Sequence, residues 1–163
     1  MKKSLDFIGL RGLSLVCNAA YIHSRVRFEE GAPERDRPLA GQSPYLVNAG
    51  LFYQHDDKGI SASLLYNRIG KRIESVGVPM QDQNEDIPDI YEMPRNSLDL
   101  TFSKKIGKAV EIKAGIQDML NSKIEYKQFV KLTDQNGGKR EREQLVRSYR
   151  PGVDINVGVS LKF

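Results

Sequence analysis

Hydrophobic and polar residues alternate with a period of two along several stretches of the chain, most regularly over residues 151–163. In this segment the residues of one phase are polar or small. The residues of the other phase are all apolar: Val153, Ile155, Val157, Val159, Leu161 and Phe163. Because successive side chains of a β-strand point to opposite faces, the pattern predicts a strand with one apolar face and one polar face.

The same alternation recurs upstream and predicts an antiparallel meander of about seven strands. The further alternating segments are residues 13–21, 45–53, 60–66, 98–102 and 110–116. Residues 3–8 are interpreted as the end of another strand. Beyond residue 123, the chain has a turn signal at Asn136-Gly137-Gly138, which predicts a long hairpin. The fold class expected is therefore all-β, with antiparallel neighbours in chain order.

The connections between the predicted strands alternate between short and long. The short ones are residues 9–12, 55–59 and 106–108, and the long ones are residues 28–43, 70–94 and the extended hairpin. All seven prolines fall in the long connections or at the first residue of a strand, where no ladder donor is lost. All short turns are thus predicted at one end of the sheet, an asymmetry typical of transmembrane β-barrels.

Composition narrows the class of protein only slightly. The chain has 163 residues, a net charge of +4 and 28% charged residues. No stretch approaches the ~18 apolar residues of a membrane helix, which excludes a helical membrane protein. A membrane barrel stays open, because only alternate residues of its strands face lipid. The single cysteine, Cys17, excludes an intramolecular disulfide and a multi-cysteine zinc site.

The residue types with chemical potential do not form a catalytic pattern, so no enzymatic activity, cofactor or metal is predicted. His23 and His55 are far apart in sequence and are expected on opposite sides of the membrane that such a barrel would span. The acidic stretch around Asp86 lacks the spacing of a calcium loop. Residues 139–143 mix both charge signs, which favours a solvated hairpin arm over nucleic-acid binding.

One charged residue conflicts with the alternation. Asp118 follows the segment 110–116 on its apolar phase, where a lipid-facing charge near mid-bilayer would cost up to a few kcal/mol. Either Asp118 lies at the rim of the apolar band, or a bulge shifts the phase there. Residues 110–133 are otherwise predicted to form one long strand, whose second half stands in water.

Five segments together resemble the C-terminal strands of a TonB-dependent outer-membrane receptor of the Bacteroidota type. They are SPYLVNAGLFYQ, ASLLYNRIGKRI, PRNSLDLTFSKKIG, VEIKAGIQDMLN and the ending YRPGVDINVGVSLKF. The resemblance covers residues 1–163. It implies a larger transmembrane barrel, of which this chain is an open arc without the plug, the TonB box and most strands. A fragment of this kind is expected to be inactive alone.

The resemblance also implies a location, partners and an activity. The location is the outer membrane of a Gram-negative cell, with the C-terminus in the periplasm. The partners implied are outer-membrane lipid and lipopolysaccharide, the plug and remaining strands of the parent chain, TonB and the barrel-assembly machinery. The parent protein would take up a scarce large nutrient, such as an iron chelate, a cobalamin-like cofactor or a glycan. The sequence does not identify which solute is transported.

Two groups of residues are candidate functional positions under this resemblance. The terminal aromatic strand of the family is read by the assembly machinery, which points to Val159, Leu161 and Phe163. A polar row is expected to face the lumen, where it would wet the interior or contact the plug and solute. Its members are Asp99, Glu111, Lys113, Gln117, Asp154, Asn156 and Lys162.

Two other architectures fit the alternation. A soluble antiparallel binding module would place the apolar phase in a core, and the sequence pI near 9.1 would then suit an anionic ligand. A small adhesion-type outer-membrane barrel would need eight strands and a closed sheet. The position of the apolar side chains and the closure of the sheet therefore distinguish the three readings.

Overall fold

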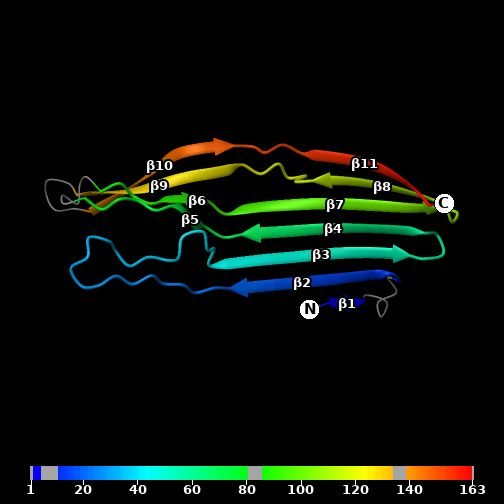
Figure 1. Cartoon of the computed structure of the whole chain (residues 1–163), viewed down its shortest axis with the longest axis horizontal. Helices are drawn as coiled ribbons and strands as arrows, with labels where there is room; N and C mark the ends of the chain where they lie inside the picture. Colours follow the sequence, from blue (N-terminus) through cyan, green and yellow to red (C-terminus); the bar gives the residue numbers. More distant parts are fainter. Residues whose placement is uncertain (1, 5–10, 81–85, 134–138, 163) are drawn as a thin grey trace.

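The computed structural model describes residues 2–4, 11–80, 86–133 and 139–162, and all regular elements in these ranges are β-strands. Seven strands form one antiparallel sheet in the order β1-β2-β3-β4-β7-β8-β11 (Figure 1). Their bounds are β1 Lys2–Ser4, β2 Leu13–Tyr21, β3 Tyr45–His55, β4 Ile60–Ile69, β7 Arg95–Ile106, β8 Val110–Gln117 and β11 Asp154–Leu161. The expected all-β antiparallel meander is confirmed.

A second sheet extends the first. It contains β5 Arg72–Ser75, β6 Ile90–Glu92, β9 Ile124–Thr133 and β10 Lys139–Tyr149, in the order β10-β9-β6-β5. Each of these strands continues a strand of the seven-stranded sheet: β5 follows β4, β6 leads into β7, β9 follows β8, and β10 leads into β11. The same four chain segments therefore cross from one sheet to the other in the same lateral order (Figure 1).

The second sheet corrects two sequence expectations. Residues 70–94 were expected to be a connection without strands, but β5 and β6 lie within them and pair through Arg72 with Glu92 and Ile73 with Tyr91. Residues 110–133 were expected to form one strand, but the chain turns between β8 and β9. Asp118 and Asn121 there have φ angles of 51° and 42°, which are incompatible with an extended strand.

The predicted hairpins are confirmed where the structure describes them. β3 and β4 pair from Leu46 with Ile69 to His55 with Ile60, and β7 and β8 pair up to Ile106 with Val110. β9 and β10 pair as expected, whereas the tip residues 136–138 lie outside the described residues. Residues 5–10, which include half of the first predicted turn, also lie outside them.

The turns and connections are distributed as the sequence predicts. The β3–β4 and β7–β8 turns lie at the same end of the sheet as the C-terminal end of β11, and the long connections lie at the other end (Figure 1). In the β3–β4 turn, Gly59 has a φ of 58° and its N–H donates to Asp56 O at 2.9 Å. This left-handed position favours glycine, which closes the hairpin tightly.

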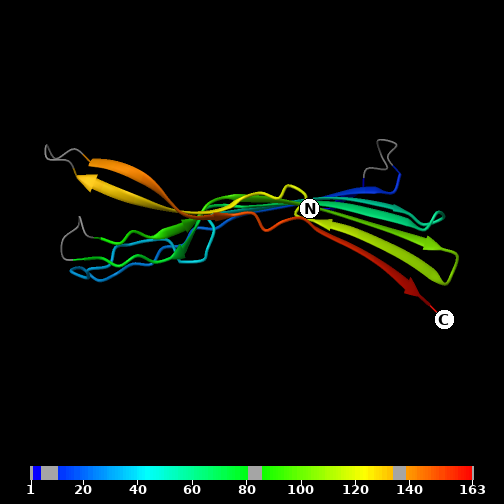
Figure 2. The ribbon, with the colours of Figure 1, turned by 90° about the horizontal axis from the view of Figure 1, so that it is seen from above.

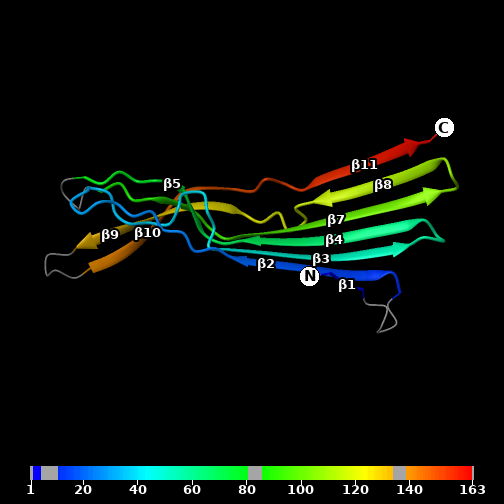
Figure 3. The ribbon, with the colours of Figure 1, turned by 60° about the horizontal axis from the view of Figure 1, so that its bottom comes forward.

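The seven-stranded sheet is open and forms a single layer. β1 lies at one margin and β11 at the other, and in the described residues no strand pairs these two (Figure 3). Seen from above, the sheet is a thin twisted ribbon with no second layer over it (Figure 2). The accessible surface is 12068 Å², against about 8,200 Å² expected for a compact monomer of this mass.

The described residues contain no hydrophobic core of ordinary size. Only Ile73, Ile124 and Tyr126 are buried hydrophobic residues, and all three belong to the four-stranded sheet. A free-standing soluble domain of this length buries most of its large apolar side chains. The seven-stranded sheet therefore lacks the interior that would stabilise it in water.

Candidate functional site

The register of the seven-stranded sheet sorts its side chains into two continuous faces. Residues paired across antiparallel strands point to the same side, so each ladder row belongs to one face. We call the side with the apolar phase the apolar face. One of its rows crosses six strands and contains Leu15, Leu51, Leu64, Leu100, Ile116 and Ile155. The next row contains Leu13, Tyr53, Ala62, Phe102, Ala114 and Val157.

The apolar face is uncovered. Val157 and Ile155 are 74% and 70% exposed, and Phe102 and Leu15 are also exposed. An exposed apolar surface that extends across a whole sheet is far larger than the patches of ordinary soluble monomers. The face thus has the character of a contact surface with a partner or an apolar medium.

The apolar band crosses the strands obliquely. On the side of the long connections, the band ends at Tyr45 in β3 and at Ile155 in β11. The row of Ile155 crosses β3 at Leu51, which is three rows of the same face away from Tyr45. Its other edge moves by two rows, from Tyr53 in β3 to Leu161 in β11. Two to three rows correspond to a shift of about 13–20 Å along the strands, and β3 and β11 are about 19 Å apart across the sheet. The band therefore makes an angle of roughly 35–45° with the direction perpendicular to the strands.

The opposite face is predominantly polar and carries the predicted polar row. The register places Asp154 beside Gln117, Asn156 beside Gly115, and Glu111 beside Lys105 and Ser160. The Lys113 ammonium lies 3.3 Å from the Glu111 carboxylate. All the predicted members therefore belong to one face: Asp99, Glu111, Lys113, Gln117, Asp154, Asn156 and Lys162.

Cross-strand hydrogen bonds link the polar face into short ladders. The Ser61 and Ser103 hydroxyls are 2.9 Å apart, and those of Ser63 and Thr101 are 2.6 Å apart. Asn67 donates to the side-chain oxygen of Asn48. These bonds satisfy side chains that would otherwise need water, so this face tolerates a wet or a protein-filled neighbour.

The polar face also holds an apolar pair that the sequence reasoning missed. Phe52 and Leu65 are exposed on this side and lie over Gly50, where an added Cβ would come within 2.7 Å of the Phe52 ring. Leu65 breaks the alternation of β4, because the neighbouring Leu64 is apolar too. The two consecutive leucines were the available signal that this strand has apolar side chains on both faces.

A belt of tyrosine, arginine and asparagine borders the apolar band on the side of the long connections. Arg68 Nη1 donates to Asn96 Oδ1 at 2.8 Å, and Arg68 Nε donates to the Tyr45 hydroxyl at 3.4 Å. The Tyr66 hydroxyl donates to the same Asn96 oxygen at 2.8 Å. Tyr21, which pairs with Tyr45, is 81% exposed. Polar tips on apolar bodies suit a boundary between an apolar and an aqueous medium.

Asp118 lies at the junction of the two sheets, just beyond the end of β8. This position matches the rim alternative of the sequence analysis. Its carboxylate binds Arg95 at 2.6 Å, and its N–H donates to Asp99 Oδ1 at 2.8 Å. The positive φ of Asp118 takes the residue out of the strand alternation, so its charge meets Arg95 on the polar face. Asp99 thus has a structural contact that its assignment to a lumen row did not predict.

The junction continues through Asn121. Its N–H donates to Asp118 O at 2.8 Å, its carbonyl accepts from Arg150 Nη1 at 2.9 Å, and its side-chain oxygen accepts from Gly152 N at 3.1 Å. The segment Asp118-Met119-Leu120-Asn121 therefore ties β7, β8 and the lead into β11 together. The resemblance highlighted these residues, but only the fold gives them this role.

The residues predicted as an assembly signal lie along the free edge strand. Val159 and Leu161 pair with Ile112 and Val110 and are exposed on the apolar face. Phe163 lies outside the described residues. The described residues of this predicted signal thus form a continuous apolar edge, and the outer side of β11 pairs with no other strand in the described residues.

The four-stranded sheet has a different character, with charges and rings in contact. The Lys71 ammonium lies 3.7 Å from the centre of the Phe129 ring and 4.1 Å from that of Tyr91. Burial and the nearby Asp89 raise the pKa of the Tyr91 hydroxyl, and burial raises the pKa of Tyr126. The hydrogen bond that the Lys127 ammonium donates to the Glu143 carboxylate raises the pKa of Lys127.

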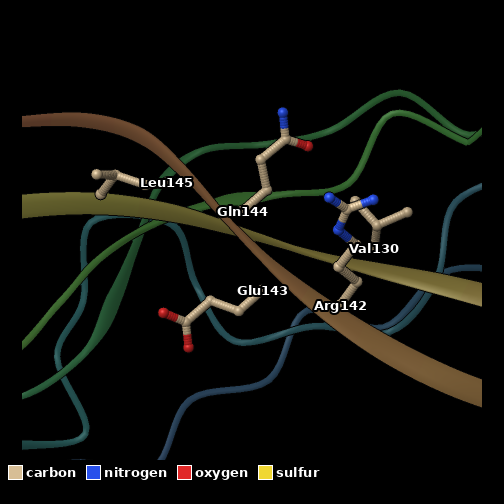
Figure 4. A pocket seen from close by; sticks show the side chains of 5 residues that line it. All are labelled: Val130, Arg142, Glu143, Gln144 and Leu145. Carbon is tan, nitrogen blue, oxygen red and sulfur yellow. The ribbon is translucent and has the colours of Figure 1, made fainter.

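Two hollows occur at this end. A cavity of about 780 Å³ lies between the connections and β6, β9 and β10, with Arg35, Lys71, Asp86 and Tyr91 among its lining residues. The other, of about 390 Å³, is lined by Val130 and four consecutive residues of β10. Figure 4 shows Glu143 and Gln144 pointing in opposite directions, so this hollow follows the surface of one strand and encloses no ligand space.

The predicted acidic patch is partly described. Asp86 binds Arg35 at 2.6 Å and accepts from Met80 N at 2.8 Å, while Asp89 accepts from Gly77 N at 2.8 Å. Asp82 and Glu85 lie outside the described residues. Within the described ranges, no cluster of three or more His, Cys, Asp or Glu side chains could hold a metal ion.

Comparison with known proteins does not assign the chain to a family. No protein-family model matches the chain, no curated protein is similar to it, and no solved structure matches its fold. The described residues contain no helix that could span a membrane. Functional inference therefore depends on the geometry of the two faces.

Proposed function

We propose that this chain forms the C-terminal part of the barrel wall of a TonB-dependent outer-membrane receptor. The apolar face contacts the hydrocarbon of the membrane, and the polar face lines the interior of the barrel. The parent protein takes up a large scarce nutrient in an energy-coupled step. The chain alone is inactive in transport, because an open arc encloses no solute path.

The oblique apolar band is the observation that carries this proposal. Strands of outer-membrane barrels tilt by roughly 35–45°, and a band parallel to the membrane must cross tilted strands at that same angle. In β3 the band spans Tyr45 to Tyr53, about 27 Å along the strand and roughly 20 Å along the membrane normal at a 40° tilt. This height is close to the apolar band of about 25 Å found in such barrels.

The two alternatives have less support. A soluble module would bury the apolar face, whereas that face is uncovered and the three buried hydrophobic residues lie elsewhere. A small closed barrel requires pairing of the first and last strands, and β1 and β11 are not paired in the described residues. Open edges with unpaired N–H and C=O groups are costly in hydrocarbon, which favours pairing of these edges with further strands or with further copies of the chain.

The single cysteine allows a direct test of the proposal. Cys17 is exposed on the apolar face, in the row with Ala49 and Tyr66, while the adjacent Asn18 pairs with Asn48 on the polar face. An environment-sensitive thiol probe is attached to Cys17 in the wild-type chain and to position 18 in the matched C17S/N18C variant. Both proteins are then reconstituted into phosphatidylcholine vesicles.

The proposal predicts that the two probes report different media. The probe at Cys17 shifts its emission to the blue and is quenched by brominated acyl chains, whereas the probe at position 18 shows neither effect. Equal polarity at both positions, or emission of a water-exposed probe from Cys17, would contradict the assignment of this face to the membrane.

A further inference from the structure

The edge of the seven-stranded sheet formed by β11 is open along its whole length. β11 has eight residues and pairs with β8, but its other side pairs with no strand in the described residues (Figure 3). Lys162 N donates to Ala109 O at 2.8 Å, so the even-numbered residues of β11 direct their N–H and C=O groups to β8. The odd-numbered residues present theirs at the open edge: Ile155, Val157, Val159 and Leu161.

The other edge strands of the two sheets have features that oppose pairing with another chain. β1 and β5 have only three and four residues. β10 begins with five charged residues and contains a bulge between Leu145 and Arg147. Short length, charge and bulges are the usual devices that keep an edge strand from pairing. β11 contains one charged residue, no proline and no bulge, so its edge is suited to accept a further strand.

The side-chain pattern of β11 and the residue after it is complementary to its own reverse. In an antiparallel pair of two such strands centred on Gly158, residues equally distant from Gly158 lie opposite each other. The resulting pairs are Val157 with Val159, Ile155 with Leu161, Asn156 with Ser160 and Asp154 with Lys162. Apolar residues meet apolar residues, polar residues meet polar ones, and opposite charges meet at both ends, all of which stabilises cross-strand neighbours.

The two charges select this register. Asp154 and Lys162 are exposed, and neither forms an ion pair in the part of the chain that the structure describes. Their neighbours on β8 and its preceding turn, Gln117 and Ala109, are uncharged. A shift of the centre by one residue keeps each face aligned but places Lys162 opposite Asn156 or Gly152 instead of Asp154. Only the register centred on Gly158 joins both charges.

Gly158 has no function in the fold of a single chain. Its φ lies outside the left-handed region, and an added Cβ would meet no atom within 4 Å. A glycine inside a strand weakens the strand and often marks the close approach of another backbone. Because Gly158 directs its backbone groups to β8, it would form a non-hydrogen-bonded pair with its counterpart, with the two Cα atoms about 4.5 Å apart. Glycine thus lies at the point of closest approach.

We propose that two copies of this chain pair through their β11 edges in an antiparallel dimer with two-fold symmetry, centred on Gly158. About eight backbone hydrogen bonds join the two strands, and an Asp154–Lys162 ion pair closes each end. The two-fold axis is perpendicular to the sheet, so the apolar faces join into one surface while the long connections of the copies lie at opposite ends. The dimer is therefore a state of the free chain, and it goes beyond the proposed function.

Disulfide formation between cysteines on β11 tests the register. The full chains of the C17S/G158C and C17S/S160C variants are refolded in detergent, which covers the apolar face, and are then oxidised. In the dimer the two positions 158 lie within the reach of a disulfide, whereas the two positions 160 are displaced by about 13 Å along the strands. Cross-linking of C17S/G158C alone is expected. Equal cross-linking of both variants, or of neither, would overturn the inference.

Exchange of the charges tests the two terminal ion pairs. Asp154→Lys and Lys162→Asp each place like charges opposite each other at both ends, and each should weaken dimerisation about tenfold in sedimentation equilibrium in detergent. The D154K/K162D variant restores opposite charges and should dimerise as the wild-type chain does. Asp57→Lys makes the same change of charge at an exposed residue of the β3–β4 turn and should have no effect.

Two results of the charge exchange contradict the dimer. A D154K/K162D variant as weak as the single variants would show that Asp154 and Lys162 do not face each other. A wild-type chain that stays monomeric at every concentration would show that the β11 edge accepts only a strand of another protein chain.

Discussion

The two sheets of this protein share four continuous chain segments but use opposite side-chain patterns. In the seven-stranded sheet the apolar and polar residues are separated onto two faces, and the apolar face stays uncovered. In the four-stranded sheet, charges and rings alternate with the three buried hydrophobic residues. A backbone that continues from one sheet to the other cannot account for this change, which agrees with the membrane and aqueous media that we propose for the two sheets.

The boundary between the two patterns coincides with breaks in all four segments. β4 and β5 are separated by Gly70, β6 and β7 by Pro94, β8 and β9 by the turn at Asp118, and β10 and β11 by Gly152 with a φ of 94°. Because the four breaks lie side by side, all four segments can change direction and side-chain phase at the same position along the sheet. The junction is therefore a structural border between the two sheets, and we propose that it lies at the membrane surface.

A charge placed on the apolar face is expected to have the largest effect. Leu100→Arg should cost about 2–4 kcal/mol of membrane insertion, because Leu100 lies in a central apolar row. Thr101→Arg places the same charge on the polar face one residue away, and Leu145→Arg places it at an apolar residue of β10 that is 55% exposed. These two controls should change insertion by less than about 1 kcal/mol.

Protease protection and flotation of the three variants with vesicles measure this difference. If Leu145→Arg impaired insertion as much as Leu100→Arg, the four-stranded sheet would also lie in the membrane. The proposed border at the junction would then be wrong.

Removal of the junction ion pair is expected to have an intermediate effect. Asp118→Ala leaves the half-buried Arg95 without its carboxylate and removes a residue suited to positive φ, so stability should fall by about 2–3 kcal/mol. Asp118→Asn keeps the backbone preference and should cost less. Asp86→Asn breaks the more exposed pair with Arg35 and should cost below about 1 kcal/mol.

Denaturant unfolding of the refolded chain, followed by far-ultraviolet circular dichroism, provides these values. An Asp118→Ala variant as stable as Asp86→Asn would show that the junction network adds little. In that case the breaks in the strands would arise from local backbone preference alone.

Alkaline pH is expected to have the smallest effect and to act on the four-stranded sheet first. The folded pKa values of Tyr91 and Tyr126 are raised above 10.0, and that of Lys127 is raised above 10.5. A raised folded pKa means that the folded state holds the proton more tightly. The associated stability is present below the unfolded pKa and disappears as pH rises through the folded pKa.

The ionisation of tyrosine, followed by absorbance at 295 nm, checks this order. The Tyr91→Phe and Tyr126→Phe variants should each lose a component that titrates above pH 10. If neither variant lost such a component, the burial of the two tyrosines would have no effect on their ionisation.

Much of the seven-stranded sheet could be predicted because its signal is local. A period of two over five or more residues specifies β3, β4, β7, β8 and β11 without knowledge of their neighbours. The short strands β5 and β6 were missed, since four and three residues are too few to show a period. Their pairing depends on β9, through Tyr91 beside Lys127, which is distant in sequence.

The break after β8 was missed for a different reason. Asp118 and Asn121 adopt left-handed backbone angles although neither is glycine, and the local pattern of residues 110–133 contained no strong turn signal. Both conformations are held by contacts from other strands, namely Arg95 and Arg150. Tertiary hydrogen bonds therefore decided a backbone feature that single-residue preferences leave open.

The sequence by itself determined the strand faces, the strand order along the meander and the grouping of short and long connections. These properties follow from the alternation of side chains and from turn composition, which act over a few residues. Only the tertiary structure decided the oblique course of the apolar band, the junction at Asp118 and the contacts of Arg68 with Tyr45 and Asn96 in the belt. Each of these depends on the register between strands, which is fixed by contacts between residues far apart in the chain.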